Sequence, residues 1–169
     1  AGQGTIGLEI MEDLPDVDVV ILPVGGGGLL AGAGSALKSL RPQTRVIGVE
    51  PERAAAMTAS LQAGTIVELT DPHSLADKLV VKAVGKLNLA MAQRYTDQMV
   101  TVSEDEIARS IITLVDKASL LAEGAAAAAL AALLSLRHEC EGKRVALVLT
   151  GGNIAPEVLA RVLAGERDR

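Results

Sequence analysis

The chain has 169 residues, about the size of one domain, and 49% of them are hydrophobic, which is enough for a buried core. Its formal net charge is −5 and its lysines and arginines are scattered, which argues against a nucleic-acid partner. No apolar run is long enough to span a membrane, and the chain does not open with a signal pattern. Together with the single Cys140, these features predict a soluble, cytoplasmic protein.

The first part of the chain predicts strands that alternate with helices. Thr5 is expected to cap a short opening helix, and Pro15 is expected to end it. Two apolar, β-branched strands are predicted at residues 19–24 and 45–50, and helices at 29–40 and 54–62. Residues 65–85 have only a weak pattern, in which 65–69 is expected to form a short strand before a loop region.

The remainder of the chain continues the alternation. The stretch Ser103-Glu104-Asp105-Glu106 forms a capping box, which predicts a helix that runs to about residue 117. Pro156 suits the first turn of a final helix that ends near residue 163. The other predicted elements are helices at 86–95 and 124–137, a strand at 98–102, and a strand at 144–150 that is apolar enough to be buried on both faces.

This alternation predicts an α/β fold. We expect a three-layer, doubly wound and mainly parallel sheet of about four strands, with helices on both faces. Residues 1–169 are expected to form a single domain. In such folds ligands bind at the carboxyl ends of the strands, so the loops that follow the strands are the first place to look for a site.

Four consecutive glycines follow the first predicted strand, and we call residues 25–28 the tetraglycine loop. Gly25, Gly26, Gly27 and Gly28 lack a Cβ, so a ligand can approach their backbone closely. The helix that follows contributes unpaired amide groups and the positive end of its dipole. This combination predicts a phosphate site, although glycines also occur where a strand and a helix only pack tightly.

A second glycine loop, Gly151-Gly152, follows the last predicted strand. Thr150 directly before it offers a hydroxyl to a flat heterocycle, so a phosphorylated aromatic cofactor would contact both loops. Glu123 precedes the alanine-rich helix and is interpreted either as a buried carboxylate of the site or as a helix cap.

A dinucleotide site is an alternative interpretation of the same loop. Residues 26–31 match the G-x-G-x-x-G/A pattern, and Glu50 ends the next strand, where it is interpreted as a ribose ligand, a metal ligand or a solvated carboxylate. His73 and His138 are not at ligand spacing from a cysteine or a carboxylate, so neither zinc nor a histidine triad is predicted.

Several stretches, in the same order along the chain, resemble the fold type II pyridoxal-phosphate enzymes, specifically the threonine and serine dehydratases and serine racemase. The stretches are Ala1-Gly2-Gln3-Gly4-Thr5-Ile6-Gly7-Leu8-Glu9, Pro23-Val24-Gly25-Gly26-Gly27-Gly28-Leu29, Gly48-Val49-Glu50-Pro51-Glu52, Val100-Thr101-Val102-Ser103-Glu104-Asp105-Glu106-Ile107, Glu123-Gly124-Ala125 and Thr150-Gly151-Gly152-Asn153.

The resemblance implies a function for the site residues. The tetraglycine loop would bind the phosphate of pyridoxal phosphate, with Glu123, Gly151 and Gly152 near the cofactor. Thr150 would face the pyridine nitrogen, and its neutral hydroxyl suits elimination. Glu50 resembles a metal ligand of some members.

Two positions depart from the family pattern. Ala56 stands where the members that bind a metal carry a second acid, which weakens the assignment of a metal to Glu50. In Ala76-Asp77-Lys78, a lysine follows the aspartate where the family usually has glycine, which puts the ordinary conformation of that loop in question.

The resemblance covers the carboxyl-terminal half of the family, most of its large cofactor-binding domain. It implies that the lysine that holds the cofactor, the loop for the substrate carboxylate and the small domain belong to the amino-terminal half. The six lysines of this chain match no such motif; they are Lys38, Lys78, Lys82, Lys86, Lys117 and Lys143. The parent would convert L-threonine to 2-oxobutanoate, while this chain alone is expected to be inactive.

We also expect the chain to form a homo-oligomer or to associate with the missing half, because a chain cut from a larger fold exposes apolar surface. A third hypothesis is an isolated or engineered fragment of the fold that has no activity.

Overall fold

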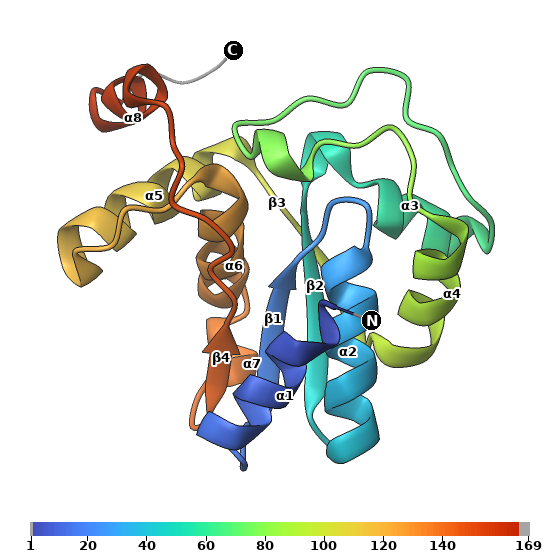
Figure 1. Cartoon of the computed structure of the whole chain (residues 1–169). Coiled ribbons are helices and arrows are strands. Elements are labelled where there is room, and N and C mark those ends of the chain that lie inside the picture. The colour runs from blue at the N-terminus through green and yellow to red at the C-terminus, as the bar shows by residue number, and fades with distance from the viewer. Residues whose placement is uncertain (1, 166–169) are drawn as a thin grey trace.

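Four parallel strands form the centre of the computed structural model, which describes residues 2–165 (Figure 1). The strands are β1 (Val19–Pro23), β2 (Arg45–Pro51), β3 (Gln98–Val102) and β4 (Val145–Leu147), and they lie in the order β3-β2-β1-β4. Their pairings are all parallel. Because β1 and β2 each have a neighbour on both sides and helices on both faces, nearly all of their residues are buried.

Helices cover both faces of this sheet, so the predicted three-layer α/β fold is confirmed (Figure 1). One layer holds α1 (Gly4–Asp13), α2 (Gly28–Leu40), α3 (Ala56–Ala63) and α4 (Lys86–Tyr95). The other holds α5 (Glu104–Ala118), α6 (Gly124–Ser135), α7 (Arg137–Cys140) and α8 (Pro156–Leu163). Two short 3₁₀ helices complete the connections, η1 (Glu52–Ala54) and η2 (Asp77–Leu79).

The alternation of side chains along the strands separates two hydrophobic cores. Val20 and Leu22 of β1 point to the layer of α1 to α4, where they join a cluster with Leu37 of α2. Ile21 points the other way and joins a cluster with Ile107 of α5 and the alanines of α6. Since alanine side chains are short, α6 lies close to the sheet.

Local sequence signals set the starts of two helices as predicted. The capping box of α5 is confirmed: the Ser103 hydroxyl accepts a hydrogen bond from the Glu106 amide, and the Glu106 carboxylate accepts one from the Ser103 amide at 2.8 Å. Pro156 occupies the first turn of α8. Gly124 lets the start of α6 lie against the backbone just before η2. A Cβ at this position would lie only 2.6 Å from the carbonyl oxygen of Leu75.

Two predicted strands differ from the structure. Residues 65–69 form no strand, because Leu69 donates its amide to the carbonyl of Lys82 instead of joining the sheet. The last strand is β4 alone, three residues long and half-buried, where burial on both faces was predicted for residues 144–150. Because β4 pairs only with β1 and lies at the edge of the sheet, its outer side lacks a strand within the part of the chain that the structure describes.

The start of α1 also differs from the prediction. The helix begins at Gly4 with Gln3 at its N-cap, so Thr5 lies inside the first turn. The Thr5 hydroxyl donates a hydrogen bond to the carbonyl of Gly2 at 3.0 Å, so it does not cap the amides. Among residues 2–165, no helix combines the length and the apolar character that crossing a bilayer requires. The ends of the predicted domain, residues 1 and 166–169, lie outside the described part.

Candidate functional site

The tetraglycine loop turns the chain from the end of β1 into the start of α2. Gly27 is the N-cap of α2 and has a φ of 85°, a left-handed conformation that glycine adopts without strain. A Cβ on Gly27 would lie 2.4 Å from Met57 Cε and 3.0 Å from Asn88 Cβ. A Cβ on Gly25 would lie 3.2 Å from the Cα of Leu79. These two glycines are therefore explained by packing and backbone conformation.

The other two glycines of the loop face open space. A Cβ added to Gly26 or to Gly28 would have no other heavy atom within 4 Å. The Asn88 side chain donates a hydrogen bond of 2.6 Å to the carbonyl oxygen of Gly26, which fixes the orientation of that peptide group. The amides of the first turn of α2 have no acceptor within the helix. The open side of the loop is therefore suited to an anion.

A cavity of about 330 Å³ lies against the open side of the loop, and we call it the tetraglycine cavity. It brings together three features that are far apart in sequence: the loop, the hydroxyl-bearing Thr150 and the carboxylate of Glu123. Its remaining lining residues are Pro23, Leu29, Lys78, Leu79 and Ala125. The cavity thus joins the carboxyl ends of β1 and β4, the edge at which the sequence predicted a ligand.

Gly151 and Gly152 allow two segments of backbone to lie against each other. A Cβ on Gly151 would lie 2.5 Å from a carboxylate oxygen of Glu123, and a Cβ on Gly152 would lie 2.6 Å from the carbonyl oxygen of Leu121. The Glu123 amide donates a hydrogen bond to the carbonyl of Gly151 at 3.1 Å. These contacts place Glu123 and Thr150 at the cavity, so the geometry gives the two glycines a positioning role.

Glu123 is the N-cap residue of α6, but its side chain makes no capping hydrogen bond. The capping interpretation is therefore right about the position and wrong about the hydrogen bond. Glu123 lines the tetraglycine cavity, and its carboxylate lies against Gly151 of the second glycine loop.

Lys78 lines the tetraglycine cavity, although the sequence analysis gave it no role in the site. Its Nζ lies 2.9 Å from Asp77 Oδ2, and both side chains are mostly exposed. The hydrogen bond and the charge of Asp77 raise the pKa of Lys78. The signal for Lys78 in the sequence was the departure from the family's glycine at this position.

Glu50 lies away from the cavity, fully buried below the start of α3. Its carboxylate accepts hydrogen bonds from the amides of Met57 and Thr58 at 2.7 and 2.8 Å, and from the Thr58 hydroxyl at 2.7 Å. Burial raises the pKa of Glu50, and these hydrogen bonds oppose that shift. Both oxygens are therefore occupied by α3, which speaks against the metal and ribose interpretations of this residue.

A metal site is not otherwise indicated. Among residues 2–165, no three side chains of histidine, cysteine, aspartate or glutamate are grouped so that they could hold a metal ion. The ring of His73 contacts Arg53 and the carbonyl of Asp71, and His138 contacts Arg137.

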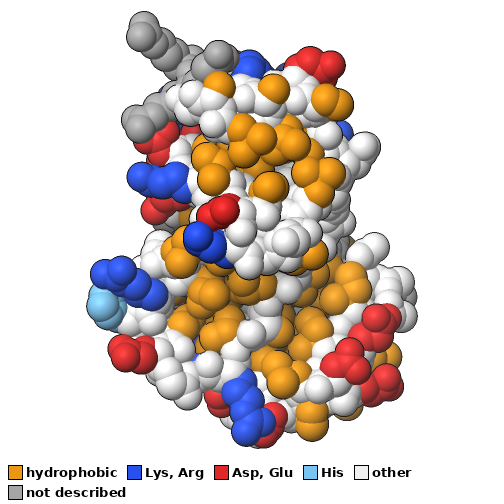
Figure 2. Space-filling model, turned by 90° about the vertical axis from the view of Figure 1, so that its left-hand side faces the viewer, with side chains coloured by type: hydrophobic (Ala, Val, Ile, Leu, Met, Phe, Trp, Pro, Cys, Tyr) orange, Lys and Arg blue, Asp and Glu red, His pale blue; other side chains and the backbone are white. Residues whose placement is uncertain are grey.

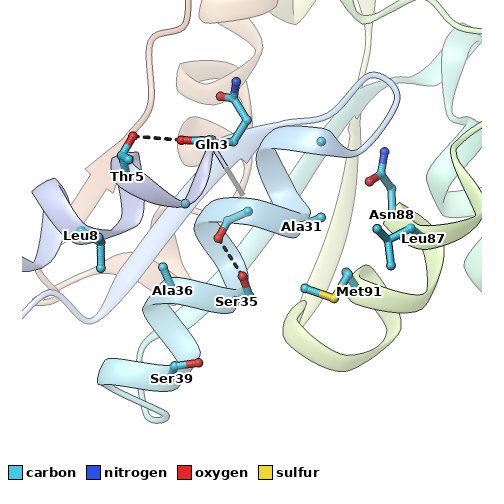
Figure 3. A pocket seen from close by; sticks show the side chains of 14 residues that line it. Gln3, Thr5, Leu8, Ala31, Ser35, Ala36, Ser39, Leu87, Asn88 and Met91 are labelled. Carbon is cyan, nitrogen blue, oxygen red and sulfur yellow. Dashed lines mark hydrogen bonds between the residues drawn. The ribbon is translucent and has the colours of Figure 1, made fainter.

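A larger groove of about 580 Å³ lies on the other side of the start of α2, between α1, α2 and α4 (Figure 3). Figure 3 shows Leu87, Asn88 and Met91 of α4 facing α2, with Gln3 and Thr5 above the same helix. Gly28 lines both this groove and the tetraglycine cavity. The lining of this groove has no charged residue, whereas Lys78 and Glu123 line the tetraglycine cavity.

A glycine loop at the start of a helix, with Thr150 and Glu123 in the same cavity, is suited chemically to a phosphorylated cofactor on an α/β fold. The chain belongs to the family of pyridoxal-phosphate dependent enzymes, which matches residues 1–151. Pyridoxal phosphate, the cofactor predicted from the sequence, is the one on which this family depends.

Among its relatives, an L-threonine ammonia-lyase from Thermotoga maritima is 48% identical over 163 residues, which are 96% of this chain and 40% of that protein. The catabolic L-threonine dehydratase TdcB of Escherichia coli is 47% identical over 91% of this chain and 47% of its own length. The chain therefore spans less than half of either relative.

Solved structures show the same fold. The processed form of threonine deaminase isoform 2 from Solanum lycopersicum superposes with a TM-score of 0.91 at 37% identity, over 96% of this chain and 46% of that one. Maize serine racemase superposes with a TM-score of 0.88 at 28% identity, over 97% of this chain and 51% of that one. The predicted likeness to threonine dehydratases and serine racemase is confirmed.

The buried carboxylate of Glu50 generates a prediction about pH. A raised pKa in the folded state means that the folded chain binds a proton more tightly than the unfolded chain does. The free energy of unfolding should therefore gain a contribution from Glu50 as the pH falls from 7 to 5. In E50Q this contribution is lost, so the wild type should gain stability relative to E50Q over that range.

Urea unfolding at pH 7, 6 and 5 measures this difference. Exposed Glu52 supplies the matched control, and E52Q should follow the wild type at each pH. Parallel curves for the wild type and E50Q would contradict the assignment.

Proposed function

We propose that this chain is the pyridoxal-phosphate-binding part of an enzyme that eliminates water and ammonia from L-threonine, giving 2-oxobutanoate. The observation that carries the proposal is the meeting of the tetraglycine loop and Thr150 in one cavity. The names of the relatives with the highest identity reported above support threonine as the substrate. The relatives include the catabolic enzyme of Escherichia coli and a biosynthetic L-threonine dehydratase, IlvA, of Halalkalibacterium halodurans, so we extend the proposal to amino-acid metabolism, including isoleucine biosynthesis.

The fit of the cofactor phosphate rests on the two open glycines. Gly26 and Gly28 border empty space, and any side chain at these positions would extend into it. The phosphate would accept hydrogen bonds from the amides of the loop and of the first turn of α2, at the positive end of the helix dipole. Gly25 and Gly27 would support the loop from behind, through their packing against η2, α3 and α4.

Thr150 and Glu123 would bind the remainder of the cofactor. When bound, pyridoxal phosphate supplies an electron sink that stabilises negative charge on the α-carbon of an amino acid. The Thr150 hydroxyl would bind the pyridine nitrogen as a neutral partner and leave it largely unprotonated, which moderates that sink. Gly151 and Gly152 would position these two residues by letting their backbones approach closely.

We infer that turnover requires the part of the relatives that this chain does not match. Lys78 is the lysine in the lining of the tetraglycine cavity, but its sequence context does not resemble the motif that holds the cofactor. The substrate carboxylate would also need a loop from outside this chain. We propose that the whole enzyme acts in the cytoplasm on a free amino acid.

The exposed apolar surface supports association with a second chain or with the remaining half. Figure 2 shows hydrophobic side chains gathered on the side of the molecule that carries β4 and α8. Leu149, two residues after β4, and Leu163 at the end of α8 are both exposed. Because no strand of residues 2–165 pairs with the outer side of β4, and its neighbours are apolar, this side of the molecule is the expected interface.

A charge at Gly26 tests the phosphate site. G26D places a carboxylate in the open space beside the loop, where it should repel the phosphate without disturbing the packing. G26N is the matched neutral control of the same size. We expect G26D to bind pyridoxal phosphate about tenfold more weakly than G26N does, as measured by equilibrium dialysis. Equal affinities of the two variants would contradict the location of the phosphate.

An activity assay tests the division of the enzyme into halves. The chain incubated with pyridoxal phosphate and L-threonine should produce no 2-oxobutanoate above the rate of the free cofactor. Adding a polypeptide that supplies the unmatched half of a relative should produce it. Steady formation of 2-oxobutanoate by the chain alone would overturn the claim that turnover needs that half.

Sedimentation equilibrium tests the association. The wild type should show a mass above that of one chain as its concentration rises, and L149E should weaken this association about tenfold. L87E is the matched control, because Leu87 is equally apolar and more exposed but lies on α4. A monomeric wild type at all concentrations would contradict the interface.

A further inference from the structure

Lys78 stands where the family usually has glycine, and it causes no strain in the backbone. It lies in η2, and among the residues of positive φ in the described chain Ser119 is the only one that is not glycine. Since a lysine fits this position as well as a glycine does, the side chain is an addition to the site and not a distortion of the loop.

The backbone of Lys78 lies directly against the tetraglycine loop. A Cβ added to Gly25 would lie 3.3 Å from the carbonyl oxygen of Lys78. Lys78 also lines two cavities, the tetraglycine cavity and a neighbouring one of about 430 Å³ that contains Asn153. The lysine therefore stands between these spaces, at the rim of the loop.

The charge of the tetraglycine cavity depends on this lysine. The charged residues in the lining are Lys78 and Glu123. Without Lys78, the carboxylate of Glu123 would face a phosphate dianion with no cationic side chain in the lining to offset it. The ammonium group of Lys78 offsets the charge of Glu123 and so favours the dianion relative to a cavity without it.

The ammonium is available to a ligand. Its partner Asp77 is exposed, as is Lys78 itself, and an exposed ion pair contributes little to stability. Like an ordinary lysine, Lys78 is charged at neutral pH, and the hydrogen bond and the charge of Asp77 raise its pKa further. The Lys78 ammonium can therefore leave Asp77 for a phosphate, or contact both groups, at little cost in free energy.

We propose that Lys78 is a specificity-determining residue for the phosphate group of the ligand in the tetraglycine cavity. The inference rests on the proposed function, because it takes the same phosphate at the same loop. Lys78 acts by pairing its ammonium with the phosphate dianion, so it raises the affinity for phosphorylated ligands and leaves the affinity for their unphosphorylated forms unchanged.

Binding of pyridoxine phosphate and of pyridoxine tests the proposal. These ligands lack the aldehyde, so no lysine reacts with them covalently, and they differ by the phosphate alone. We expect K78Q to bind pyridoxine phosphate about fivefold more weakly than the wild type and to bind pyridoxine equally well. K78R should retain most of the affinity, and added salt should reduce the difference between the wild type and K78Q.

Lys143 supplies the matched control, because it is exposed and precedes β4, at the amino ends of the parallel strands, whereas the cavity lies at their carboxyl ends. K143Q should bind both ligands as the wild type does. If K78Q and the wild type bind pyridoxine phosphate equally, the role of Lys78 is overturned while the phosphate site stands. If the wild type shows no preference for pyridoxine phosphate over pyridoxine, the phosphate site and the role of Lys78 are both overturned.

Discussion

The close approach of backbone and side chains at Gly27 is the constraint on which the site depends. Its left-handed conformation turns the chain from β1 into α2, so that the start of the helix opens at the edge of the sheet. Met57 of α3 and Asn88 of α4 lie where a Cβ would stand, so this one residue lets two further elements close around the loop. A larger residue would separate these elements and strain the turn, because L side chains rarely adopt this φ.

Local signals were sufficient for the elements whose sequence and surroundings agree. The buried strand β1, the capping box at Ser103 and Pro156 in α8 were all predicted, because each depends on neighbours within a few residues. Residues 65–85 were not, because their contacts come from tertiary structure. The amide of Val67 donates to the hydroxyl of Ser60 in α3, a contact that no periodicity encodes. The strand β4 is shorter than its apolar sequence suggested, because an edge position gives it a single partner.

The candidate site was predictable in its location but not in the division of tasks among its residues. Four identical glycines carry no sequence signal that separates Gly26, where an added Cβ would meet open space, from Gly27, where it would meet the side chains of Met57 and Asn88. The carboxylates show the same limit. Glu50 and Glu123 both lie near the ends of buried elements, yet one is enclosed by the amides of α3 and the other reaches the cavity. Only the packing of distant segments distinguishes them.

The hydrogen bond from Asn88 to the carbonyl of Gly26 has a consequence for the thermodynamics of binding. A glycine-rich loop has many conformations, and ordering it around a ligand would ordinarily cost conformational entropy. Here Asn88 of α4 already fixes the peptide group that carries the Gly26 carbonyl, so much of that conformational entropy is lost when the chain folds. The loop is thus organised before any anion binds, and α4, which contributes no residue to the lining of the cavity, would set part of the affinity for such an anion.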